Sequence, residues 1–144
     1  ARIPPRRAAV FLETRGSTVS ADLDVDIAQP GLLTPDARPG GTVPGGRRVD
    51  SFLLARPGGD VGERPWRGRL RFAGRILGVQ AAADTLSGGA ELAAPETGYP
   101  ASLGGVAGQD RLRITPGGRA LEFELTGERA TQVRVVVETT EVPR

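Results

Sequence analysis

The chain has 144 residues and a formal net charge of +2 at neutral pH, which suits a single domain with a core of its own. It contains no cysteine, no histidine and no lysine, so all 19 basic residues are arginines. Disulfides, thiolate or imidazole metal sites, and nucleophile–base pairs of the Ser–His, Cys–His or Ser–Lys type are therefore excluded. The small excess of arginine does not by itself indicate a nucleic-acid partner.

The chain begins with ARIPPRR and continues directly into the apolar run AAVFL. Its two prolines cannot donate to a β-ladder, and only one side chain of this leader is large and apolar enough to pack deeply. We expect residues 1–12 to form an N-terminal arm and edge strand that contacts another copy of the protein. The alternative is that this strand belongs to its own sheet. The residues expected at the subunit contact are Ile3, Val10, Phe11 and Leu12.

The first residue is alanine and the sequence contains no methionine, which is typical of a chain whose leader peptide has been removed. No stretch approaches the roughly 20 consecutive apolar residues that a membrane-spanning helix needs. We therefore expect a secreted protein that does not insert into a membrane.

Residues 18–28 read TVSADLDVDIA, in which apolar and polar residues alternate as in a strand with one buried face. The carboxylates of Asp22, Asp24 and Asp26 are spaced like the opening of an EF-hand calcium loop. Such a loop requires Gly and Glu at its sixth and twelfth positions, where this chain has Ile and Leu. We therefore expect a row of surface carboxylates that face solvent or a row of arginines and bind no metal.

The middle of the chain predicts further strands at residues 49–55, 67–72 and 75–80, which are rich in Leu, Val and Phe or alternate with Arg. Trp66 and Tyr99 are the only large amphipathic aromatic residues, and each lies beside a proline in an expected loop. Such side chains are candidate contacts for a glycan, because sugars stack on aromatic platforms. The alternative is that both side chains pack at the ends of the fold.

The clearest hairpin lies between RLRIT (residues 111–115) and ALEFELT (residues 120–126), which are joined by a Pro-Gly-Gly turn. The apolar side chains of both strands fall on one face and are expected to be buried. The arginines of the first strand face the glutamates of the second, which predicts cross-strand ion pairs. The alternative use for these arginines, and for Arg67, Arg69 and Arg71, is to bind a polyanion such as an acidic glycan.

These elements amount to about eight or nine strands. The segment QAAADTL suggests one short helix, and residues 87–109 are expected to form a long loop. The sequence therefore predicts an all-β fold with at most one or two short helical turns. An antiparallel β-sandwich of the jelly-roll or Ig-like type is favoured, with a barrel as second choice. Residues 13–144 would form this single sandwich domain behind the N-terminal arm.

Several of these segments resemble a family of secreted bacterial β-domains of unknown function. The similarity lies in VDSFLLA (residues 49–55), the stretch GRLRFAGRILGVQ (residues 68–80), the GYP of the expected loop, and the C-terminal strands from residue 110 onward. Family members pair a VDSYLLHFDP-like strand with an ILGV strand, and some carry cell-surface sorting signals. The chain has Ala-Arg-Pro where the family has His-Phe-Asp-Pro. The resemblance implies an extracellular all-β domain and supplies no active site.

Together these observations predict a non-enzymatic extracellular structural protein, a self-assembling subunit of a surface fibre or layer that associates through its N-terminal arm and strand. The alternative is a carbohydrate-binding module of a secreted or cell-surface protein. We expect no cofactor, no metal and no nucleic-acid partner. The expected partners are further copies of the chain and, for the alternative, a polysaccharide.

Overall fold

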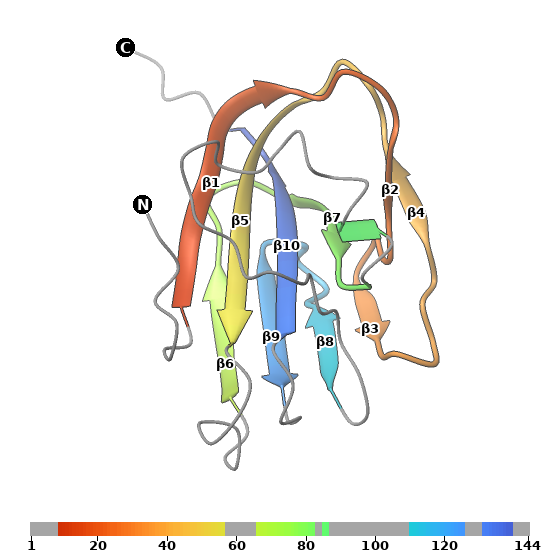
Figure 1. Ribbon diagram of the computed structural model, residues 1–144, viewed down its shortest axis with the longest axis vertical. Coiled ribbons are helices and arrows are strands. Elements are labelled where there is room, and N and C mark those ends of the chain that lie inside the picture. The colour runs from red at the N-terminus through yellow and green to blue at the C-terminus, as the bar shows by residue number, and fades with distance from the viewer. Residues whose placement is uncertain (1–8, 57–65, 83–84, 87–109, 126–130, 140–144) are drawn as a thin grey trace.

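The computed structural model describes residues 9–56, 66–82, 85–86, 110–125 and 131–139 (Figure 1). Ile3, Tyr99 and the loop predicted at residues 87–109 lie outside these described residues, so their predictions are not tested. The described residues form ten strands and no helix longer than a turn. The strands are β1 (Ala9–Thr18), β2 (Leu23–Val25), β3 (Gly31–Leu33), β4 (Gly41–Val43), β5 (Arg48–Arg56), β6 (Trp66–Arg71), β7 (Ile76–Gln80), β8 (Arg111–Ile114), β9 (Ala120–Leu125) and β10 (Thr131–Glu138).

Two four-stranded sheets with the orders β1-β5-β10-β7 and β3-β8-β9-β6 make up most of the fold, and all their pairings are antiparallel. The sheets lie face to face with their strands roughly aligned, so that β1 and β6 flank one side of the molecule and β7 and β3 the other (Figure 1). The predicted all-β antiparallel sandwich is therefore confirmed.

The core between the two sheets follows from alternation along each strand. On β10, Val133, Val135 and Val137 face the second sheet, and on β9 Leu121, Phe123 and Leu125 face back. The buried side chains of this core are Ile27, Leu33, Leu54, Ile76, Val79, Ala81, Leu112, Ile114, Leu121, Phe123, Leu125, Val133, Val135 and Val137.

The short sheet β2-β4 forms a third layer on the other face of the first sheet. Its Leu23, Val25 and Val43 pack with Val136, which belongs to the β10 face opposite to the sandwich core. The layers approach closely at Gly78, where an added Cβ would lie 2.7 Å from Val25 Cγ1. Because β10 is covered on both faces, it carries buried valines on both, with Val136 on one face and Val133, Val135 and Val137 on the other.

The hairpin predicted around the Pro-Gly-Gly turn is confirmed. Strands β8 and β9 pair antiparallel, and Gly118 adopts φ of 74°, which a side chain would disfavour. The predicted inward residues of both strands are buried.

The strand predicted over residues 18–28 is replaced by two elements. Strand β1 ends at Thr18, and β2 spans only Leu23–Val25 before the chain bends. Strand β1 also runs through residue 12, at which the sequence analysis divided the arm from the domain, and its backbone pairs with β5 on both sides of that position.

Candidate functional site

Strand β1 occupies the end of the first sheet, and within the described part of the chain only β5 pairs with it. Its first four residues pair regularly, from Ala9 opposite Ala55 to Leu12 opposite Phe52. We call residues 9–12 the regular half of β1. Among the described residues the outward N–H and C=O groups of this half pair with no other strand, and such an edge is a template to which another strand can add.

Two apolar side chains of the regular half are incompletely buried. Val10 and Leu12 are each 38% exposed, although they lie on the core face of the sheet opposite Leu54 and Phe52. On the same face the ring of Phe52 packs against that of Phe72, which follows β6, with centroids 5.0 Å apart. The edge at β1 therefore combines incompletely buried apolar side chains with backbone groups that pair with no other described strand.

The other sheet ends differ from β1. The backbone of β7 is engaged by the chain after β2, since Asp26 N donates to Val79 O at 2.8 Å and Val79 N donates to Ile27 O at 2.9 Å. Strand β3 has only three residues. Strand β6 carries exposed arginines, which discourage strand addition. The regular half of β1 is thus the longest apolar edge in the described structure.

The regular half ends at a β-bulge, and the bulge aims Glu13 into the protein. The register passes from Leu12 opposite Phe52 to Thr14 opposite Ser51, so Glu13 is the extra residue. Its carboxylate is buried and accepts two hydrogen bonds from Arg134, from Nε at 2.7 Å and from Nη2 at 3.1 Å. This pair sits on the face of the first sheet that points away from the sandwich core.

The remaining polar atoms around this pair are also bonded. Ser51 Oγ donates to Glu13 Oε1 at 2.7 Å, and Arg134 Nη1 donates to Gln80 Oε1 at 2.9 Å and to Leu86 O at 2.8 Å. No buried side-chain nitrogen or oxygen among the described residues lacks a partner. Burying two charges is costly unless their bonding is completed in this way, so the network fixes the bulge in one geometry.

A second irregularity follows at Gly16, and we call residues 13–18 the bulged half of β1. Gly16 has φ of 64°, and its N–H donates to Asp50 Oδ1 at 2.7 Å. Arg48 Nε donates to Gly16 O at 3.2 Å. Bulges twist an edge strand away from regular pairing, so the bulged half is protected and the regular half is not.

Three residues expected at the subunit contact thus lie in the regular half. Val10 and Leu12 are half-exposed there, and the backbone of Phe11 lies opposite Leu53. The sequence did not reveal the network behind them. The available signal was a Glu that directly follows the apolar run AAVFL and an Arg that stands between two valines in QVRVVVE.

Trp66 does not lie in a loop as expected, because it is the first residue of β6. Its ring makes an edge-to-face contact with the ring of Phe123, with centroids 4.9 Å apart and planes at 67°. Trp66 is partly buried against the sandwich core. This is the packing arrangement that the sequence analysis kept as the alternative to a glycan platform.

The expected row of surface carboxylates is wrong at Asp26. Asp22 and Asp24 are exposed, but Asp26 is buried and accepts hydrogen bonds from Ala81 N at 2.6 Å and Ala82 N at 2.8 Å. Thr85 Oγ1 donates to the same oxygen at 2.6 Å. The chain leaves strand geometry after β2, so alternation no longer decides which side chains face water. No three carboxylates in the described residues are grouped closely enough to hold a metal ion.

The predicted Arg–Glu pairing on the outer face of the second sheet is confirmed and extends further than expected. Strand β9 lies between β8 and β6, so each glutamate has an arginine on both sides. The N–O distances are 3.2 Å for Arg111–Glu124, 3.9 Å for Arg113–Glu122 and 3.8 Å for Arg67–Glu124. We call these residues, with Arg69, the Arg–Glu ladder.

The described part of the chain contains no helix that is long and apolar enough to cross a bilayer. Comparison with protein-family models, with curated proteins and with solved structures found no match to this chain.

Proposed function

We propose that the protein is a non-enzymatic structural protein that associates with further copies of itself through the regular half of β1. The observation that carries this proposal is the regular edge at residues 9–12, which pairs with no described strand besides β5 and includes half-exposed Val10 and Leu12. A second copy is the favoured occupant because the segment is self-complementary. In an antiparallel pair with Phe11 opposite its counterpart, Val10 of one copy meets Leu12 of the other on the same face.

The strength of this contact follows from its size. Removing the remaining 38% exposure of Val10 and Leu12 contributes about 1–2 kcal/mol per copy. This free energy is smaller than the cost of association. The remaining stabilisation would have to come from the hydrogen bonds of the backbone ladder, from further apolar contacts near Phe52 and Phe72, and from the arm with Ile3. Association is therefore expected to depend on concentration and to gain from many copies acting together.

The finer part of the proposal places the protein outside the cell as a subunit of a surface fibre or layer. Support for this comes from the resemblance to secreted β-domains and from the lack of His, Cys and Lys for common catalytic pairs. A two-fold pairing of β1 strands closes at a dimer, whereas a head-to-tail addition continues into a filament. The β1 pair described above is the two-fold form, so growth into a fibre or layer requires a further head-to-tail contact, which we assign to the N-terminal arm.

Sedimentation velocity over a range of concentrations tests the contact. Leu12→Lys places a charge at the open edge, and Leu32→Lys is the matched control, because Leu32 is an exposed leucine of the other sheet, at 54%. Wild type and the control should associate equally, while Leu12→Lys remains a folded monomer by circular dichroism. Association of Leu12→Lys to the wild-type extent, or a wild type that stays monomeric throughout, would overturn the proposal.

Negative-stain microscopy of the associated wild type tests whether the copies form a fibre or layer. Fibres or layers that are lost in Leu12→Lys support it. Closed dimers alone would keep the β1 contact and rule out the fibre.

A further inference from the structure

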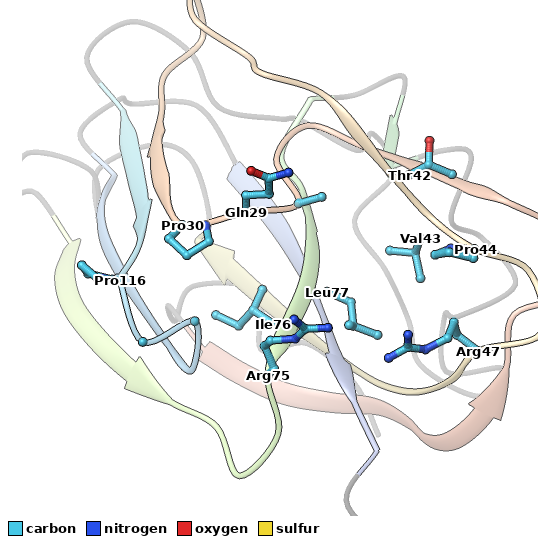
Figure 2. A pocket seen from close by; sticks show the side chains of 13 residues that line it. Gln29, Pro30, Thr42, Val43, Pro44, Arg47, Arg75, Ile76, Leu77 and Pro116 are labelled. Atoms are coloured by element: carbon cyan, nitrogen blue, oxygen red, sulfur yellow. The ribbon is translucent and has the colours of Figure 1, made fainter.

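A pocket of about 500 Å³ lies between the end of β4, the start of β7 and the β8–β9 turn (Figure 2). Four segments meet there: residues 28–30 after β2, residues 42–44 at the end of β4, residues 75–77 at the start of β7, and residues 116–118 in the β8–β9 turn. Its volume falls within the range of small-molecule sites in proteins. None of its lining residues belongs to the edge to which we assign self-association.

Arg47 and Arg75 are the charged residues that line this pocket. Their guanidinium groups point toward each other across Leu77 (Figure 2). Both approach one carboxylate oxygen, Glu138 Oε2, which is 3.5 Å from Arg47 Nη2 and 3.9 Å from Arg75 Nε. These distances are too long for good hydrogen bonds, so nearly all N–H donors of the two guanidinium groups remain available.

The backbone on both sides of Arg75 is held by hydrogen bonds. Arg75 O accepts from Glu138 N at 2.8 Å, and the next residue, Ile76, donates its N–H to Gly118 O at 2.7 Å. The side-chain stem of Arg75 passes over Gly118, where an added Cβ would lie 3.3 Å from Arg75 Cγ. The turn glycine thus leaves room for the arginine to reach the pocket.

The charge of the site selects the kind of anion. Two guanidinium groups and the carboxylate of Glu138 leave one net positive charge, which matches a monoanion rather than a dianion. A carboxylate offers two oxygens to a pair of arginines and forms charge-assisted hydrogen bonds with them.

The rest of the pocket fits a ring with one apolar face and several hydroxyls. Pro30 and Pro116 line one end of the pocket and Pro44 the other, with Ile76 and Leu77 between them (Figure 2). Gln29 places an amide with both a donor and an acceptor on the rim beside Pro30 (Figure 2). A sugar presents C–H groups on its ring face and hydroxyls at its edge.

We propose that this pocket binds a sugar acid, a pyranose ring that carries a carboxylate, with Arg47 and Arg75 holding the carboxylate and the prolines contacting the ring. This goes beyond self-association, since it gives the protein a ligand at a site that includes none of residues 9–12.

Isothermal titration calorimetry with galacturonic acid as the probe tests the assignment. Wild type should bind galacturonic acid and not galactose, which lacks the carboxylate. Arg47→Gln and Arg75→Gln should each weaken binding about tenfold or more, because each removes charge-assisted hydrogen bonds. Arg67→Gln is the matched control, since it removes the same charge from the exposed Arg–Glu ladder and should bind like wild type.

Each other result is decisive against the proposal. Equal binding of galactose would show that the carboxylate is not recognised. Equal competition by inorganic sulfate would reduce the site to a general anion site. Unchanged affinity in both pocket variants, while both remain folded by circular dichroism, would show that the arginines do not bind the ligand. No heat of binding for wild type at millimolar galacturonic acid would show that the pocket does not bind this ligand.

Discussion

Both four-stranded sheets carry Arg–Glu pairs, but the two sets lie in opposite surroundings. Glu13 and Arg134 are buried behind the first sheet and joined at 2.7 Å, with every neighbouring polar atom bonded. The ladder pairs on the second sheet are looser, as the 3.9 Å between Arg113 and Glu122 shows, and their arginines are more than half exposed. The same two residue types therefore interact with different strength, because the buried pair is desolvated and the ladder pairs are screened by water.

The difference has a structural consequence at the edge of the first sheet. A ladder pair can break without moving the backbone, whereas the buried pair holds Glu13 as the extra residue of a bulge. That bulge ends the regular half of β1 and begins the bulged half. The buried pair thus determines where the regular half of β1 ends. The Arg–Glu ladder has no comparable effect on the backbone.

Removing one member of the buried pair should give the largest effect. Arg134→Ala leaves the Glu13 carboxylate buried without its cation, which should cost about 3–5 kcal/mol of unfolding free energy. Urea denaturation measures the loss, with Arg113→Ala of the ladder as control. A loss below about 1 kcal/mol would mean that water or another group replaces Arg134.

The two faces of β9 sharpen the comparison within one strand. Phe123 faces the core against Trp66, and the neighbouring Glu122 faces the ladder. Phe123→Ala should cost about 3–5 kcal/mol through the cavity it leaves. Glu122→Ala should cost under about 1 kcal/mol in the same denaturation experiment. Similar losses for the two variants would show that the inward and outward faces are wrongly assigned.

The bulged half of β1 can be tested through its glycine. Gly16→Ala places a side chain at φ of 64°, with the new Cβ 3.1 Å from the Arg48 guanidinium, and should cost about 1–2 kcal/mol. Gly117→Ala is the control, because a Cβ there meets no atom within 4 Å. A thermal melt compares the two. Equal melting temperatures would show that the backbone at Gly16 is not held in this conformation.

The ladder should give the smallest effect. A double-mutant cycle on Arg113 and Glu122 should return a coupling of about 0.2–1 kcal/mol that falls as salt is added. A coupling above about 2 kcal/mol, or one insensitive to salt, would place the ladder in the same class as the buried pair.

The sequence predicted the regular parts of the fold well. Alternation around the Pro-Gly-Gly turn gave the β8–β9 hairpin, its buried residues and the facing Arg and Glu side chains, because all of these depend on local strand geometry. The apolar run at residues 8–12 indicated a strand, and residues 9–12 belong to β1.

The sequence could not predict what depends on contacts between distant segments. Glu13 and Arg134 are 121 residues apart, and their pairing follows from a bulge that leaves no pattern in the chain. Asp26 was misassigned for the same reason, since its partners Ala81, Ala82 and Thr85 lie more than 50 residues away. The pocket of Arg47 and Arg75 likewise forms only when four separate segments meet.

Hydrogen exchange along β1, measured at increasing protein concentration, tests the central claim most directly. In a lone molecule the outward N–H groups of residues 9–12 pair with no other described strand, and in the proposed assembly they donate to the strand of another copy. We predict that protection of residues 9–12 rises with concentration, while protection of residues 13–18 stays constant. Assembly that proceeds with unchanged protection of residues 9–12 would contradict the account.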